Sequence, residues 1–202
     1  MKLYYAPGAC SMAPHIALCE AELNYDLEKV DIGAKRTEHG RDYTEINPKG
    51  YVPALELDGG ALLTEVSAVI QYVVDQSPTS GLTPRPGTME RYRLLEWLGF
   101  IATELHKGFG PLWDPDTPDA YKGTVRGKLA TRFGHLNDQL AEREHLLDSG
   151  FSAADAYAFT ILNWTGFHSI DLAPWPNVRA YVSRVAARPK VQQAMREEGL
   201  LQ

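Results

Sequence analysis

Asn47-Pro48-Lys49-Gly50-Tyr51-Val52-Pro53-Ala54-Leu55 is the most informative stretch of this chain. A proline directly before a short apolar run indicates a constrained turn that leads into a strand. If the Val52–Pro53 bond is cis, the backbone of Val52 is turned outward, where its N–H and C=O can pair with an extended peptide as an added strand does. The alternative is a plain turn into an edge strand. Taken alone, this segment favours that simpler interpretation.

The segments around this stretch alternate between the periodicities of strands and helices. The expected elements, in order, are a strand at residues 3–5, a helix at 11–23, a strand at 26–32, a short irregular helix within 35–46, a hairpin formed by 54–57 and 61–63, and a helix at 67–75. The order βαβαββα is typical of a small α/β domain. We place this domain at residues 1–78.

Residues 77–88 are crowded with serine, proline and glycine, which indicates a linker. We place the linker at residues 79–88 and an all-helical domain at 89–202. The expected helices cover residues 89–109, 119–146, a segment that begins after Ser152, 177–187 and 190–198. Prolines 111, 115 and 118 are expected to break the chain between the first two helices. Ser152, with Asp155 three residues later, predicts a capping box.

Composition and charge exclude several classes of protein. The chain has 202 residues, of which 44% are hydrophobic and 23% charged, and its net charge is -6. A basic surface for nucleic acid is therefore not expected. No apolar run reaches the roughly 18 residues that a membrane helix needs, and the N-terminal residues do not resemble a signal peptide. Two cysteines make no disulfide framework, so we expect a cytoplasmic protein. No motif for a metal site is present, and no metal is predicted.

Cys10 lies between Pro7-Gly8-Ala9 and the first expected helix. The unpaired N–H groups and the positive dipole of a helix start favour a thiolate and lower the pKa of a cysteine. Ser11 can cap the helix, or its hydroxyl can donate to a nearby sulfur. The alternative is a small apolar residue in a turn, and for Cys10 the two interpretations are about equal. Cys19 lies on the apolar stripe of the same helix and is expected to be a core residue.

Thr64-Glu65-Val66-Ser67 opens the last helix of the first domain. The N–H groups of Val66 and Ser67 can hold a carboxylate, and Glu65 can pair with an ammonium beside that carboxylate. Together they would clamp the head group of an amino acid. The alternative is simple capping of the helix by Thr64.

Taken together, these stretches resemble the glutathione transferase superfamily over essentially the whole chain. Tyr4-Tyr5-Ala6-Pro7-Gly8-Ala9-Cys10-Ser11 with Pro14-His15 is similar to the bacterial beta class, in which a cysteine occupies the active-site turn. His106-Lys107-Gly108-Phe109 is similar to the second-domain signature of that class, and residues 151–155 resemble the capping motif of the superfamily. The resemblance implies a thioredoxin-like N-terminal domain followed by an all-helical C-terminal bundle.

The resemblance also implies the residues of a glutathione site. Cys10 would lie near the glutathione sulfur, with the helix start at Ser11 stabilising the thiolate and His106 facing the two sulfurs. The residues that would bind the rest of glutathione are Val52 with cis-Pro53 at the peptide backbone, Glu65, Val66 and Ser67 at the γ-glutamyl group, Lys35 and Tyr51 at the glycine end, Lys107 from the helical domain, and Glu104 from a partner subunit. The superfamily often has serine where Val66 stands, so the hydroxyl contact is lost unless Ser67 replaces it, and weaker binding is expected.

The predicted function is a cytoplasmic glutathione transferase, a homodimer active in detoxification, which joins glutathione to small hydrophobic electrophiles and needs no other cofactor. Phe109, Leu112, Trp113 and Trp164 are candidates for the electrophile pocket. The first alternative is a glutathione-dependent thiol–disulfide reductase, peroxidase or reductive dehalogenase that works through a Cys10–glutathione disulfide. The second alternative is a non-enzymatic ligand-binding or interaction module.

Overall fold

The computed structural model describes residues 1–201, which form two compact units. The first unit comprises Met1–Thr83 and the segment from Arg188 onward, and the second comprises Pro84–Ala187. The sequence-based division placed all of residues 89–202 in the helical domain. The structure instead groups the last helix with the first unit, because that helix packs against the first helix of the chain.

The first unit is built on a mixed five-stranded sheet with the strand order β3-β2-β1-β4-β5. The strands are β1 (Lys2–Tyr5), β2 (Asp26–Asp31), β3 (Arg36–Thr37), β4 (Ala54–Glu56) and β5 (Leu62–Thr64). Strand β1 runs parallel to β2 and antiparallel to β4, while β3 and β5 are antiparallel edge strands. The sequence pattern missed β3, a strand of two residues that lies within the segment predicted as an irregular helix.

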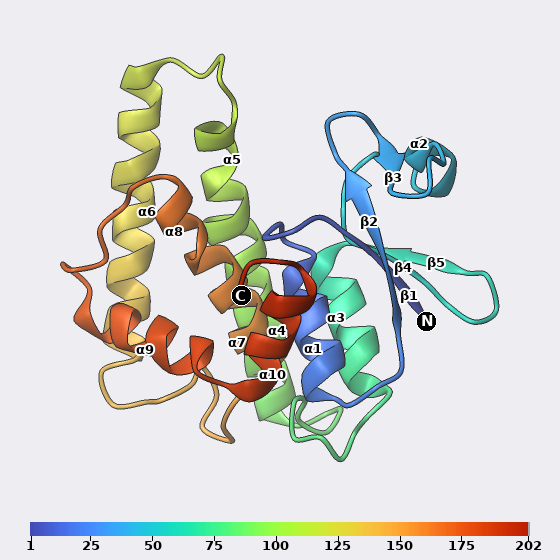
Figure 1. Cartoon of the computed structure of the whole chain (residues 1–202). Helices are drawn as coiled ribbons and strands as arrows, with labels where there is room; N and C mark the ends of the chain where they lie inside the picture. Colours follow the sequence, from blue (N-terminus) through green and yellow to red (C-terminus); the bar gives the residue numbers. More distant parts are fainter. Residues whose placement is uncertain (202) are drawn as a thin grey trace. The chain divides into compact units, whose positions relative to one another are not determined.

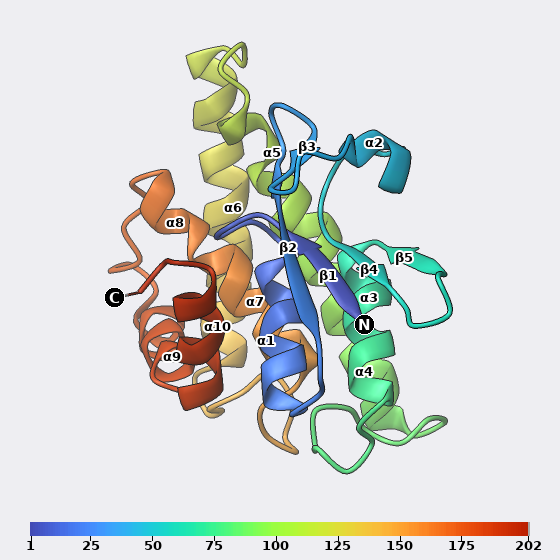
Figure 2. The same ribbon diagram turned by 45° about the vertical axis from the view of Figure 1, so that its right-hand side comes forward.

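Helices cover both faces of this sheet. The helices are α1 (Met12–Glu20), α2 (Tyr43–Ile46), α3 (Val66–Asp75) and α10 (Pro189–Glu197). Neighbouring residues of a strand point to opposite faces. Tyr5 accordingly meets His15 of α1, and Tyr4 meets Tyr43 of α2. Figures 1 and 2 show α1 between α3 and α10, and α1 contacts both.

The second unit is entirely helical (Figure 1). Its helices are α4 (Met89–Phe100), the π-helix η1 (Ile101–His106), α5 (Lys107–Trp113), α6 (Asp119–Gln139), α7 (Ala153–Leu162), α8 (Trp164–Phe167) and α9 (Pro176–Ala186). Every residue of α7 is buried, and this helix contacts α4, η1 and α9. Helix α7 is therefore the core of the unit.

The structure confirms the predicted α/β domain followed by helices, although the helix predicted at 119–146 ends at Gln139. The predicted capping box is present: the Asp155 carboxylate accepts hydrogen bonds at 2.9 Å from the backbone N–H and from the hydroxyl of Ser152. Pro111 does not break the chain as predicted, because it lies inside α5, and the helix continues to Trp113. Within residues 1–201, no helix is both long and apolar enough to cross a membrane.

Candidate functional site

Cys10 lies in the tight loop between β1 and α1, where the sequence predicted it. Its thiol donates a hydrogen bond to the carbonyl oxygen of Val52 at 3.2 Å, and the residue is half-buried. Helix α1 begins two residues later, at Met12. The N–H groups of Met12 and Ala13 donate to the carbonyls of Ala9 and Cys10, so the positive end of the helix dipole is what favours a thiolate at this position. The loop thus presents a partly accessible sulfur beside a backbone carbonyl and a helix start.

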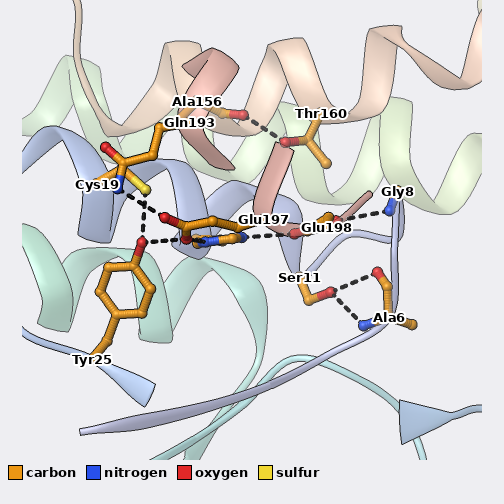
Figure 3. A network of polar contacts seen from close by, with 11 residues as sticks. Ala6, Gly8, Ser11, Cys19, Tyr25, Ala156, Thr160, Gln193, Glu197 and Glu198 are labelled. Carbon is orange, nitrogen blue, oxygen red and sulfur yellow. Dashed lines mark hydrogen bonds and ion pairs between the residues drawn. The ribbon is translucent and has the colours of Figure 1, made fainter. Parts of the chain in front are cut away.

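The Ser11 hydroxyl has neither of the two roles that the sequence suggested for it. Its side chain is fully buried and does not cap α1. The hydroxyl donates to the carbonyl of Ala6 at 3.3 Å and accepts from the N–H of Ala6 at 3.1 Å (Figure 3). Ser11 therefore closes the loop that carries Cys10.

The turn before β4 has the predicted backbone, because the Val52–Pro53 peptide bond is cis. The carbonyl of the preceding Tyr51 accepts hydrogen bonds from the Tyr43 hydroxyl at 3.1 Å and from the Asn47 side-chain amide at 2.7 Å. The side chains of Tyr43 and Asn47 thus stabilise the turn through the carbonyl of Tyr51. Val52 and Pro53 are themselves buried, and the Val52 carbonyl lies at the Cys10 thiol.

Glu65 stands at the start of α3 in a backbone conformation that few residues adopt. Its φ is 72°, in the left-handed region, and this residue, not Thr64, is the N-cap of α3. Such a conformation is costly for a residue with a side chain and is often found at functional sites. The side chain is about half exposed. Its carboxylate accepts hydrogen bonds from Lys49 at 2.5 Å and from the Tyr51 hydroxyl at 2.7 Å.

Lys49 is a member of this site that the sequence analysis missed. Its ammonium contacts both Glu65 and the hydroxyl of Thr64, and the hydrogen bond to Glu65 raises the pKa of Lys49. The Glu65 carboxylate, which was predicted to bind an ammonium group of the ligand, is thus already paired with the ammonium of Lys49. The signal available in the sequence was a lysine within the Asn47–Leu55 stretch, but nothing in the pattern paired it with Glu65.

Lys35 and Tyr51, predicted together at one end of the ligand, are held by different groups. The Lys35 ammonium donates to the carbonyl of Gly50 at 2.6 Å. The Tyr51 hydroxyl instead lies at Glu65, so the side chain belongs with the residues at the start of α3. Val66 and Ser67 form the first turn of that helix, where backbone N–H groups are available to an anion.

His106 is the last residue of the π-helix η1 in the second unit. Its Nδ1 lies 2.6 Å from the Tyr157 hydroxyl, and its ring meets Trp164 edge-on at 5.1 Å between centroids. These contacts fix the ring orientation. π-helical segments inside longer helices occur often at functional sites. Periodicity predicted one uninterrupted helix here and did not reveal the π-helix.

Glu104 and Lys107 flank His106 on the same helical segment. The Glu104 carboxylate is bound by the guanidinium of Arg132, with contacts of 2.7 Å and 2.6 Å. Glu104 is thus paired within its own chain. Lys107 is exposed and borders a hollow of about 280 Å³ that Glu104 and Arg132 also line.

Residues 8–76 match the glutathione S-transferase N-terminal domain, and residues 100–189 match the glutathione S-transferase C-terminal domain. The chain belongs to the glutathione S-transferase family. The resemblance inferred from the motifs is therefore confirmed.

Individual glutathione S-transferases are similar over the whole chain. Glutathione S-transferase GstA of Escherichia coli O157:H7 is 46% identical, with 99% of this chain and 100% of that protein covered. The structure of the bacterial beta class glutathione S-transferase of Sphingomonas chungbukensis has a TM-score of 0.96 at 45% identity, with 100% of both chains covered. A sphingomonad glutathione S-transferase complexed with glutathione has a TM-score of 0.95 at 44% identity, with 99% of this chain and 100% of that chain covered.

These comparisons establish that the chain is a glutathione transferase with glutathione as its co-substrate. An enzyme, rather than an interaction module, is the predicted function that they confirm. In this glutathione S-transferase, three of the four candidates for the electrophile pocket are core residues. Phe109 is fully buried against Phe133 and Trp164, and Leu112 and Trp164 are buried too. Trp113 is about half exposed and remains available to a ligand.

In this glutathione S-transferase, a buried network of polar side chains supports the loop that carries Cys10. The N–H of Gly8 donates to Glu198 at 2.8 Å, and Glu198 lies 2.9 Å from Nδ1 of His15 (Figure 3). Nε2 of the same ring lies 2.8 Å from Glu197. Burial lowers the pKa of His15, but hydrogen bonds to Cys19 and Glu198 outweigh it and raise the pKa to about 10. His15 is therefore an imidazolium between two carboxylates at neutral pH.

This imidazolium predicts a fall in stability with rising pH. An unfolded histidine loses its proton near pH 6.5, whereas folded His15 keeps it to about pH 10. The contribution is complete below about pH 6.5 and is lost as the pH rises through about 10. Between these values we expect His15 to lower the free energy of unfolding by about 1.4 kcal/mol per pH unit. Urea unfolding of the wild type and of His15→Gln across this range measures the slope, and equal slopes for the two proteins would contradict the assignment.

Proposed function

We propose that this glutathione transferase binds glutathione along the cis-Pro53 turn, with the glutathione sulfur next to Cys10, and conjugates it to a small hydrophobic electrophile. The observation that carries the proposal is the 3.2 Å hydrogen bond between the Cys10 thiol and the Val52 carbonyl. An extended tripeptide that pairs with the backbone of Val52, as an added strand does, brings its central cysteine to the same place. The ligand sulfur and Cys10 would then share one helix start.

The chemistry of conjugation follows from this position. The dipole at the start of α1 stabilises a thiolate and so raises the fraction of ionised glutathione at neutral pH. The thiolate attacks an electrophilic carbon, a carbon–sulfur bond forms, and the leaving group departs with its electron pair. Binding both reactants in one site supplies the remaining gain in rate. The predicted roles of His106 and Lys107 at the sulfur, and of Glu104 toward a partner subunit, stay predictions.

The residues at the start of α3 support recognition of the γ-glutamyl head group. Its carboxylate would accept hydrogen bonds from the N–H groups of Val66 and Ser67, and its ammonium would donate to the Glu65 carboxylate. Lys49 offers the same chemical group to Glu65. The ligand's ammonium would thus replace an ammonium of the chain, and the Glu65 carboxylate would keep a cationic partner in both states.

Glu65→Gln tests this assignment. Removing the charge while keeping the shape should weaken glutathione binding by roughly tenfold, the effect of losing one charge-assisted hydrogen bond. Calorimetric titration of glutathione into the reduced protein measures the change. Glu45→Gln is the matched control, because Glu45 is an exposed acid of α2 in the same unit. Equal affinities for wild type and Glu65→Gln would contradict the assignment.

A thiol at position 10 also favours a second candidate function, glutathione-dependent disulfide reduction. In that reaction the Cys10 thiolate attacks the glutathione sulfur of a mixed disulfide between glutathione and a substrate thiol, and the substrate leaves as its thiolate. A second glutathione thiolate then attacks the Cys10–glutathione disulfide, which releases the Cys10 thiolate and glutathione disulfide, so two glutathione sulfurs are oxidised as the substrate is reduced. We expect Cys10→Ser to abolish disulfide reduction and to leave conjugation partly intact, since serine keeps a hydrogen-bond donor but forms no disulfide. Parallel assays of the two activities decide between the functions, and two unchanged activities would show that Cys10 has neither role.

The remaining expectations are a homodimer, a cytoplasmic location and a role in detoxification. They rest on the family resemblance and on the cysteine content. Gel filtration with light scattering measures the first of them directly.

A further inference from the structure

A second cluster of reactive side chains lies on the side of α1 that faces α10, within the first unit. His15 and Cys19 stand four residues apart on α1, so they share one face of the helix. Glu197 is the last residue of α10, and Tyr25 comes directly before β2. Figure 3 shows the sulfur of Cys19, the hydroxyl of Tyr25 and the carboxylate of Glu197 directed toward one another. None of these side chains is among the residues proposed to bind glutathione.

The donor atoms of this cluster lie close enough to share one ion. One ligand atom each from His15, Cys19 and Glu197 lie within 4.8 Å of one another. Nε2 of His15 is 2.8 Å from Oε2 of Glu197. The Tyr25 hydroxyl is 2.6 Å from that same oxygen and 3.0 Å from the Cys19 sulfur. The four side chains thus surround one small volume.

We propose that His15, Cys19 and Glu197 form a zinc-binding site that joins α1 to α10. An imidazole nitrogen, a thiolate and a carboxylate are the three ligand types that zinc prefers in proteins. Such a set, with one soft sulfur among harder donors, does not suit magnesium or calcium, which take oxygen ligands. The Tyr25 hydroxyl lies beside the Cys19 sulfur and the Glu197 carboxylate, where it would supply or bind the fourth ligand of the ion.

The surroundings of His15 match those of a metal-binding histidine. A ligating histidine usually donates its other ring N–H to a carboxylate, which fixes the tautomer and aims the free nitrogen at the metal. Nδ1 of His15 lies 2.9 Å from Glu198, whose side chain is fully buried. Glu198 is fixed in turn by the N–H of Gly8. Nε2 is therefore the ring nitrogen that faces the other ligands.

The charge balance and the hydrogen bonds of the cluster also permit zinc to replace the protons of its ligands. Zinc would displace the proton on Nε2 of His15 and the thiol proton of Cys19, so two positive charges leave and two arrive. The hydrogen bonds that must be broken join Tyr25, Glu197, Cys19 and His15 to one another. An ion at the centre replaces them with bonds to itself.

The cluster has a path for the ion. His15 and Cys19 are buried, but about a third of the Glu197 side chain is exposed, and Tyr25 is half-buried. Zinc would therefore enter past Glu197. Because the ligands come from α1 and from the end of α10, bound zinc would stabilise the docking of the last helix.

The test is calorimetric titration of zinc chloride into the metal-free, reduced full chain. It is carried out in a Cys10→Ser background, where Cys19 is the remaining cysteine. We expect saturable binding of a single equivalent and a rise in the unfolding temperature with zinc concentration. Cys19→Ser and Glu197→Gln should each weaken binding by at least about tenfold. Glu45→Gln, an exposed acid of the same unit, is the matched control and should leave binding unchanged.

Cobalt(II) gives a second measurement that does not depend on affinity. Bound at the same site, it should show a sulfur-to-cobalt charge-transfer absorption in the wild type and in Cys10→Ser, and none in Cys19→Ser. If Cys19→Ser fails to fold, the spectrum of Cys10→Ser and the affinity of Glu197→Gln decide the question, because Glu197 is partly exposed. Absence of saturable zinc binding, binding that survives Cys19→Ser, or a sulfur band that disappears with Cys10→Ser would each overturn the proposal.

Discussion

Glu198→Ala is expected to lower the free energy of unfolding by about 3–5 kcal/mol, the usual cost of removing one partner of a buried ion pair. The Glu198 side chain is fully buried and bonds both the N–H of Gly8 and Nδ1 of His15. Its removal leaves a buried imidazolium and a buried N–H without that acceptor. The loop that carries Cys10 loses its support at Gly8 at the same time.

The neighbouring Glu197 supplies the matched control. It bonds the other nitrogen of the same ring, but about a third of its side chain is exposed, so water can replace part of what it gives. We expect Glu197→Ala to cost about 1 kcal/mol. Urea unfolding at neutral pH in the presence of a chelator measures both variants, with unchanged slope and shifted midpoint. Equal losses for the two variants would contradict the importance that we assign to burial.

Asp155→Ala is expected to cost at least about 3 kcal/mol, because it leaves several buried donors without an acceptor. The side chain is fully buried at the start of α7. At 2.9 Å its carboxylate accepts hydrogen bonds from the backbone N–H groups of Leu146 and Ser152 and from the Tyr181 hydroxyl. Asp155 thus joins the preceding loop, the helix start and α9.

A solvent-exposed cap in the same unit provides the comparison. The Thr88 hydroxyl accepts from the N–H of Arg91 at 3.2 Å at the exposed start of α4. Thr88→Ala should cost about 1 kcal/mol, as is usual for an N-cap. Thermal and urea unfolding of the two variants measure the difference. A loss for Asp155→Ala no larger than that for Thr88→Ala would show that the buried connections add nothing to the cap.

Local chemistry explains which parts of the fold the sequence revealed. Proline and glycine act on the backbone of their own and neighbouring residues, so the position of Cys10 in a loop between strand and helix was correctly predicted. The capping box of Ser152 and Asp155 depends on partners only a few residues apart. The periodicity of apolar residues likewise located most helices to within a few residues.

The pairing of distant side chains was not available from such patterns. Lys49 forms an ion pair with Glu65, and Arg132 forms one with Glu104, although no local sequence pattern predicts either pair. Strand β3 has two residues and exists because it pairs with β2, so its own sequence carries almost no signal. The position of Phe109 in the core rather than in an open pocket also depends on the helices around it.

Sequence patterns were sufficient for the order of most elements and for the cysteine before α1, whereas the cis bond before Pro53 followed only from the family resemblance. The first two depend on bonds and contacts within a few residues of chain. That α10 packs on α1, and that His15 lies between Glu197 and Glu198, is visible only in the folded chain. An apolar helix face predicts that the face will be buried, but it does not predict which element will cover it. Hydrophobic burial is non-directional, so the covering element depends on the packing of the whole unit.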